Sequence, residues 1–181
     1  MIDSKGYLKL MDFKFAKKLV GGKTFSLCGV PDYLAPEVIM NEGHDWGVDC
    51  WALGALMYEM ISGLPPFCSD TEVETYTKIV SGRIEFTSIF NTELEDLIKS
   101  LCNIDQSKRM GRVKGGWKLV QQHLWFSGFQ WDTLRSKNME AIYLPNQQES
   151  NSNTDLTSDV NENLESKVGE NHMTFLIFPS V

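Results

Sequence analysis

The chain has 181 residues, 42% of them hydrophobic, which suits one globular domain with a tail or a piece of a larger protein. Its 24 acidic and 17 basic residues give a net charge of −7 without a concentrated basic patch, which argues against a nucleic-acid-binding protein. Widely spaced cysteines, no secretory signal and no apolar run of membrane-spanning length lead us to expect reduced thiols and a cytoplasmic location.

The first segment, Met1 to Asp12, reads as a small β-hairpin. Its turn signal is Asp3-Ser4-Lys5-Gly6, and an alternating apolar pattern follows that turn. From Phe13 to Pro36 the chain has little periodicity and much Gly, Lys and Ser, which predicts a long loop. Loops of that length within compact domains are usually functional.

Helical patterns dominate the middle of the chain. From Val48 to Ile61 apolar residues occur on nearly every face, which predicts a helix that is buried on all sides and ends at Gly63. A second helix is expected from Glu72 to Ser81. Its expected apolar face consists of Val73, Tyr76, Ile79 and Val80.

Two further helices are expected after residue 90. The sequence Thr92-Glu93-Leu94-Glu95 matches a capping box at the beginning of the first of them. Its apolar stripe consists of Leu94, Leu97, Ile98, Leu101 and Cys102. A less regular pattern near Trp117 to Leu124 predicts the other helix.

The composition changes after about Met139. Residues 147–171 are mostly polar, with too little apolar surface to offset the entropy of ordering, so we expect disorder there. The last residues, Met173 to Val181, are apolar again, which suggests docking elsewhere. Taken together, the patterns predict a mainly α fold with one small β-hairpin.

Several short motifs occur in a fixed order. They are Asp12-Phe13, Ala35-Pro36-Glu37, Gly43-His44-Asp45, Asp49-x-Trp51-Ala52-Leu53-Gly54, Gly63-x-Pro65-Pro66-Phe67, Tyr76-x-Lys78-Ile79-Val80-Ser81-Gly82 and Lys108-Arg109-x-Gly111. This series resembles the AGC group of serine/threonine protein kinases, in particular the cyclic-AMP- and cyclic-GMP-dependent enzymes. The resemblance covers residues 1 to about 145.

The resemblance implies a protein-kinase large lobe at residues 1–135, without the ATP-binding lobe, and an AGC tail at residues 136–181. It also implies ATP and Mg²⁺ as cofactors of the complete kinase. Asp12 would then hold Mg²⁺ on the ATP phosphates, because a hard cation takes oxygen ligands. Phe13 would pack inward and position Asp12.

The segment before Glu37 resembles a kinase activation segment. The resemblance places the activation-loop phosphate on Ser26, with Lys23 as a local partner, although an unmodified loop serine fits the sequence equally well. It also makes Glu37 and Arg109 a buried ion pair that anchors the end of the segment. Asp49 would accept hydrogen bonds from the backbone of the catalytic loop.

Other matching positions concern partners. Asp32 and Glu59 resemble carboxylates that bind basic residues of a protein substrate. Phe175 and Phe178 resemble the hydrophobic motif that ends the AGC tail. A cyclic-nucleotide-binding regulatory region or subunit is a further candidate partner.

The chain departs from the family pattern in two ways. It contains no glycine-rich loop and no H-R-D-x-x-x-x-N catalytic loop, so the catalytic Asp would precede Met1 and this chain alone is expected to be inactive. Lys14 replaces a glycine, Val30 a threonine and Asp32 a glutamate. Three interpretations stay open: a piece of an active kinase, a pseudokinase or truncated paralogue that acts by binding, and an unrelated helical binding protein.

Overall fold

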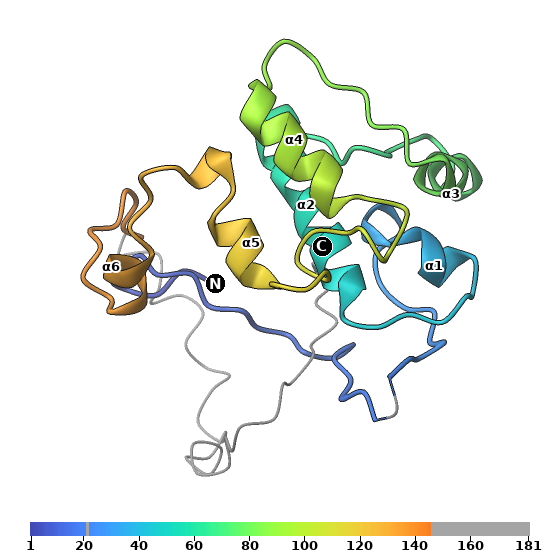
Figure 1. The fold of residues 1–181 in the computed structure, drawn as a ribbon, viewed down its shortest axis with the longest axis horizontal. Coiled ribbons are helices and arrows are strands. Elements are labelled where there is room, and N and C mark those ends of the chain that lie inside the picture. Colours follow the sequence, from blue (N-terminus) through green and yellow to red (C-terminus); the bar gives the residue numbers. More distant parts are fainter. Residues whose placement is uncertain (21, 146–181) are drawn as a thin grey trace. The chain divides into compact units, whose positions relative to one another are not determined.

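The computed structural model describes residues 1–20 and 22–145. In this part of the chain the helices are α1 (Pro36–Ile39), α2 (Gly47–Ser62), α3 (Glu72–Ser81), α4 (Thr92–Leu101), α5 (Trp117–Gln121) and α6 (Trp131–Arg135), with the 3-10 helices η1 (Pro31–Tyr33) and η2 (Leu124–Phe126). Pairing between extended segments is confined, in the same residues, to isolated bridges of Ile2 with Leu8 and Thr24 with His44. The predicted mainly α fold is confirmed (Figure 1).

The described residues divide into two compact units. The first unit consists of residues 1–12 and 130–145, and the second of residues 13–20 and 22–129. The domain boundary that the sequence predicts between residues 135 and 136 stays a prediction.

The first unit contains the turn predicted near the beginning of the chain. The amide of Gly6 donates to the carbonyl of Asp3 at 2.9 Å, and the amide of Asp3 donates to the carbonyl of Tyr7 at 2.9 Å. The hydroxyl of Tyr7 donates to the carbonyl of Met139 at 2.8 Å. Gly6 is required here because its φ is +82° and a Cβ would lie 2.3 Å from the Cβ of Ala141. The expected hairpin is therefore a tight turn closed by an isolated bridge.

The core of the second unit forms around α2. Helices α2 and α4 lie side by side (Figure 1), and a Cβ at Gly54 would approach the Sγ of Cys102 to 2.5 Å. As predicted, α2 ends at Gly63, which adopts a left-handed conformation. Burial on all sides is wrong for the last turns, because the buried residues of α2 extend only as far as Met57 and Met60 is 66% exposed.

Helix α4 buries the predicted apolar stripe. Its members Leu94, Leu97, Ile98, Leu101 and Cys102 are each at most 4% exposed. The predicted capping box at Thr92 is wrong, because the N-cap is Asn91, whose side chain accepts a hydrogen bond from the amide of Leu94 at 2.8 Å. An N-cap needs extended backbone, which Asn91 has and which Thr92, the first helical residue, lacks.

Helix α3 has the predicted bounds but a different buried face. Thr75 and Ile79 are 3% and 0% exposed, whereas Val73 and Val80 are 74% and 38% exposed. Helix α3 contacts α1 and η1, which cover Thr75 and Ile79, four positions apart, while Tyr76 is partly buried against the core. The predicted face is wrong for the two valines.

Three predictions fall outside the described residues. They are the disorder of residues 147–171, the docking of the apolar end Met173 to Val181, and the hydrophobic motif at Phe175 and Phe178. Within the described residues, no helix combines the length and the apolar composition needed to cross a membrane.

Candidate functional site

A buried ion pair fixes the end of the long segment that runs from Phe13 to Glu37. Nη1 and Nη2 of Arg109 donate to the two carboxylate oxygens of Glu37 at 2.6 and 2.8 Å. Glu37 and Arg109 are 2% and 0% exposed. Arg109 also donates to the carbonyls of Asn103 and Gly47, at 2.9 and 3.0 Å. The pairing that the sequence predicts is present, and it joins residues 72 positions apart.

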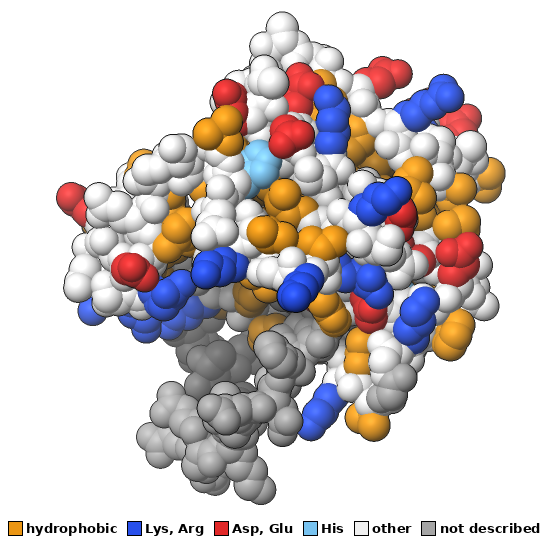
Figure 2. Space-filling model, viewed as in Figure 1, with side chains coloured by type: hydrophobic (Ala, Val, Ile, Leu, Met, Phe, Trp, Pro, Cys, Tyr) orange, Lys and Arg blue, Asp and Glu red, His pale blue; other side chains and the backbone are white. Residues whose placement is uncertain are grey.

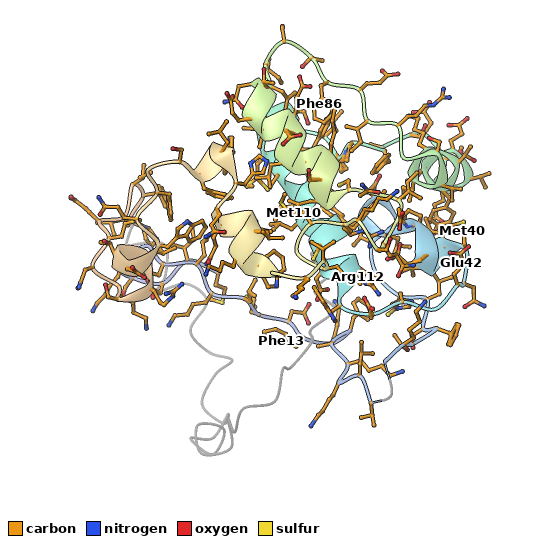
Figure 3. All side chains as sticks on the ribbon, in the orientation of Figure 1. Phe13, Met40, Glu42, Phe86, Met110 and Arg112 are labelled. Carbon is orange, nitrogen blue, oxygen red and sulfur yellow. The ribbon has the colours of Figure 1, made fainter. Side chains whose placement is uncertain are left out.

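A second arginine makes a similar contact close by. Nη2 of Arg112, which lies beside the beginning of α2 (Figure 3), donates to Oδ2 of Asp45 at 2.8 Å. Oδ1 of Asp45 accepts from the amide of Gly47 at 2.8 Å. Burial by itself would raise the pKa of Asp45, but the hydrogen bonds from Arg112 and Gly47 outweigh it and lower that pKa. Asp45 is therefore held in its ionised form.

The bridge between Thr24 and His44 fixes the middle of the long segment. The amide of Thr24 donates to the carbonyl of His44 at 2.8 Å, and the amide of His44 donates to the carbonyl of Thr24 at 2.9 Å. Because reciprocal bonds of this kind join directly opposed residues, the two side chains lie on the same face. Both residues are buried, at 5% and 2% exposure.

Ser26 lies close to a lysine that the sequence did not indicate. Nζ of Lys17 donates to Oγ1 of Thr24 at 2.9 Å and lies 3.5 Å from Oγ of Ser26. The two hydroxyl oxygens of Thr24 and Ser26 are 3.3 Å apart. The predicted partner Lys23 makes no such contact among the described residues, because alternate residues of an extended chain face opposite sides.

His44 is buried with part of its polar surface unused. Among the described residues, its Nε2 atom has no hydrogen-bond partner. Burial lowers the pKa of His44 below its ordinary value, and the charges of Lys17 and Lys23 act in the same direction. The carboxylates of Glu37 and Asp45 oppose this shift without reversing it. The imidazole is therefore neutral at pH 7.

The two carboxylates assigned to substrate binding are half-buried. Asp32 lies in η1, which contacts both α2 and α3, and Glu59 lies near the end of α2. Among the described residues, neither carboxylate forms an ion pair. Burial and, to a smaller degree, the charges of Glu72 and Asp32 raise the pKa of Tyr76.

Asp12 ends the first unit and Phe13 begins the second. Asp12 is exposed and has a φ of +58°, an uncommon conformation that Asp tolerates better than most residues. Phe13 is 47% exposed (Figure 3). The expectation that it packs inward is wrong, because residues 13–15 belong to no helix or strand and lie at the surface.

The donor set for a metal ion is incomplete. Among the described residues, no three His, Cys, Asp or Glu side chains lie together in a group that could hold a metal. Asp12 offers one carboxylate, whereas Mg²⁺ requires close to six oxygen ligands. The described residues by themselves therefore do not fit a magnesium site.

Comparison with known proteins accounts for the ordered motifs. A family model described as "Protein kinase domain" matches residues 1–126. The chain belongs to this family. The mainly helical architecture of the described residues is consistent with the large lobe of a kinase, as the sequence predicts.

Several relatives are cyclic-nucleotide-dependent kinases by name. The chain is 44% identical over 145 residues to the cAMP-dependent protein kinase catalytic subunit of Dictyostelium discoideum, an alignment that covers 80% of this chain and 22% of that protein. It is 43% identical over 145 residues to the human cAMP-dependent protein kinase catalytic subunit PRKX, covering 80% and 40%. With human cGMP-dependent protein kinase 2 it shares 42% identity over 144 residues, covering 78% and 19%.

The predicted likeness to kinases of this type is confirmed. The kinase chain nevertheless spans only about a fifth to two fifths of the length of these relatives.

Two departures from the kinase pattern have local contacts in the structure. Val30 packs against a buried cluster of Tyr33, Ala52 and Ala55, which a methyl group suits better than a hydroxyl. Nζ of Lys14 lies 5.3 Å from the centre of the Phe15 ring, within the range of a cation–π contact.

Sequence reasoning did not assign roles to Lys17, His44, Asp45 and Arg112 of this kinase chain. The motif Gly43-His44-Asp45 contained a signal, because an Asp shortly before a helix is a typical capping residue. No comparable signal links Asp45 to Arg112, which lies 67 positions further along the chain.

Proposed function

We propose that this chain is part of an ATP-dependent serine/threonine protein kinase that phosphorylates proteins carrying basic residues in the cytoplasm. The observation that carries the proposal is the buried pair of Glu37 and Arg109, which closes the long segment in a member of the kinase family. Relatives named as cAMP- and cGMP-dependent protein kinases support the reaction type.

Asp32 and Glu59 are the proposed binding groups for basic substrate residues. Both are half-buried carboxylates, and among the described residues no cation pairs with them, which suits binding of a substrate guanidinium. The contact of η1 with α2 brings the elements that carry them together. A substrate without Arg or Lys would leave these acids unpaired and is expected to be poor.

We propose that the 181-residue chain by itself transfers no phosphate. Its sequence contains no H-R-D-x-x-x-x-N motif, so it has no family-type residue to accept the proton of a substrate hydroxyl. ATP and Mg²⁺ are cofactors of the proposed complete kinase, in which Asp12 is one metal ligand among several. The metal would neutralise phosphate charge there.

Ser26 is proposed as a site that another protein kinase phosphorylates. In that reaction an Oγ–P bond forms, the bond from the terminal phosphorus of ATP to ADP breaks, and the hydroxyl proton passes to a base of the modifying enzyme. Lys17, already 3.5 Å from Oγ, is positioned to pair with the new phosphate. Ser26 is exposed, as a modification site must be.

Other parts of the proposal concern regions beyond the described site. Residues 1–135 would form the large lobe and residues 136–181 the tail, with Phe175 and Phe178 docking on the ATP-binding lobe. Asp49, in the first turn of α2, would bind the backbone of the catalytic loop. A cyclic-nucleotide-binding region or subunit would be the regulatory partner.

A chimaera tests the proposal directly. Residues 1–181 would be joined to the ATP-binding lobe and catalytic loop of human PRKX and assayed with labelled ATP, Mg²⁺ and an Arg-containing peptide. We expect transfer by the chimaera and none by the 181-residue chain. In the chimaera, Glu59→Ala should raise KM for that peptide about tenfold, the equivalent of losing about 1.4 kcal/mol. The exposed acid Glu93 offers a matched control, because Glu93→Ala should leave KM unchanged.

The second candidate function is a pseudokinase that acts by binding. The contact of Val30 with the apolar cluster that contains Tyr33 favours it, because this side chain packs against apolar neighbours. The same chimaera separates the two functions. Activity that appears only after Lys14→Gly and Val30→Thr would support the pseudokinase, whereas activity in the unaltered chimaera would exclude it.

A further inference from the structure

Four side chains of the second unit form a polar cluster around the Thr24–His44 bridge. Thr24 and His44 project to the same face because their backbones are joined by reciprocal hydrogen bonds. Ser26 lies on that face as well, since its Oγ is 3.3 Å from Oγ1 of Thr24. Lys17 contacts both hydroxyls. The cluster thus contains two hydroxyls, one ammonium group and one imidazole.

Burial is the main reason that the pKa of His44 is lowered, and the charges around the imidazole do not reverse this effect in the unmodified chain. The carboxylates that raise the pKa of His44 belong to Glu37 and Asp45, and each already accepts two or more hydrogen bonds from an arginine, Arg109 or Arg112. The positive charges of Lys17 and Lys23 lower the pKa of His44 further. A proton on His44 is therefore favoured only by carboxylates that are already paired with arginines, and their effect does not offset burial.

We propose that His44 takes up a proton when Ser26 is phosphorylated, and that the imidazolium and Lys17 then hold the phosphate together. This inference rests on the proposed modification of Ser26. It names His44 as a second cationic group of the site, supplied by the loop between α1 and α2. The unused Nε2 atom of His44 provides the donor.

The physical basis is the exchange of a neutral hydroxyl for a strong anion. A phosphoserine carries a charge of about −1.5 to −2 at pH 7, with three acceptor oxygens. An opposite charge within a few ångströms favours the protonated form of histidine, and burial strengthens the interaction. The phosphate would therefore offset the desolvation that keeps His44 neutral, and the bridge with Thr24 places the imidazole on the same face as Ser26.

The coupling also works in the opposite direction. If phosphate favours protonated His44, then protonated His44 favours the dianionic phosphate by the same factor. The phosphate and the imidazole are therefore expected to titrate as one coupled pair. Below the pH at which His44 loses its proton, the phosphorylated segment would be held by two cations, and above it by Lys17 alone.

Nuclear magnetic resonance on the full 181-residue chain tests the inference. Phosphoserine would be introduced at position 26 during translation, and the ring protons of the three histidines would be titrated in the modified and unmodified chains. We expect the midpoint of His44 to rise by at least about one pH unit, a tenfold gain in proton affinity. His123, which pairs with Asp96 elsewhere in the second unit, is the internal control and should not shift.

A second measurement follows the phosphorus nucleus of the same modified chain. Its titration should show a step that coincides with His44, and this step should vanish in His44→Gln, a variant that keeps a neutral donor. A His44 midpoint that is unchanged by phosphorylation, or an equal shift at His123, would overturn the inference.

Failure here is distinguishable from failure of the proposed function. Whether Ser26 is phosphorylated in cells is answered by mass spectrometry of the native protein, and whether the kinase is active is answered by the chimaera.

Discussion

At the residue scale, the end of the segment from Phe13 to Glu37 is fixed by the ion pair of Glu37 with Arg109, which is buried away from water. Glu37→Gln would leave Arg109 buried without its counter-charge, so we expect the free energy of unfolding to fall by about 3–5 kcal/mol. Urea denaturation measures this loss. Glu42→Gln changes an exposed acid in the following turn (Figure 3) and should stay within about 0.5 kcal/mol. Similar losses in both variants would contradict the assignment.

His44 makes the free energy of unfolding of the unmodified chain depend on pH, with a sign that follows from the direction of its pKa shift. Folding lowers the pKa of His44, chiefly through burial, so below about pH 6.5 the unfolded chain binds a proton that the folded chain does not. Stability should therefore fall with pH from that value down to the lower pKa of the folded state. His44→Gln should remove this contribution, as urea denaturation over a pH series would show. Retention of the full dependence in His44→Gln, or its loss in the control His123→Gln, would count against this explanation.

At the element scale, the structure shows which of two adjacent residues caps the beginning of α4. The cap is Asn91, whereas the sequence pattern predicted Thr92. Asn91→Ala removes the acceptor of the Leu94 amide and should lower the free energy of unfolding by about 1 kcal/mol. Thr92→Ala, at the adjacent exposed position, should have an effect near zero or be slightly stabilising, since Ala is the better helix former. Thermal unfolding of both variants provides the comparison. The reverse order of effects would restore the capping box at Thr92.

The buried faces of α3 and α4 have different causes. One follows from local apolar spacing and the other from contact with distant elements. The apolar stripe of α4 follows from spacing within ten residues, and it was predicted correctly. The buried face of α3 was predicted correctly for Ile79 and wrongly for Val73 and Val80, because contact with α1 and η1 covers Thr75 and Ile79 and leaves the two valines exposed. Apolar spacing identifies a helix, but neighbouring elements decide which stripe is buried.

At the scale of the whole molecule, burial divides the cysteines into reactive and protected groups. Burial raises the pKa of Cys50 and of Cys102 to about 12, so neither forms a thiolate near neutral pH. Cys68 is exposed and Cys28 is half-buried. We expect a thiol reagent such as DTNB to modify Cys68 fastest, and Cys50 and Cys102 only after denaturation. Rapid reaction of all four thiols in the native chain would show that the core is not formed as described.

Exposed hydrophobic side chains are a second feature of the whole molecule. Figure 2 shows hydrophobic groups between charged ones on one face. In the second unit, Phe25, Leu27, Met60 and Leu64 are between 62% and 67% exposed. Exposed apolar surface of this kind often marks contact surfaces, which fits a chain that spans less than half the length of its kinase relatives.

The sequence by itself determined the family, the mainly α fold and the bounds of α3, because ordered motifs, apolar spacing and a terminal glycine are properties of neighbouring residues. It also indicated Glu37 and Arg109, through their places in two motifs. Only the tertiary structure decided that Lys17 rather than Lys23 meets Ser26, that Arg112 binds Asp45, and that His44 lies buried opposite Thr24. The physical reason is that pairing and burial depend on which distant segments pack together, and such contacts leave no periodic pattern along the chain.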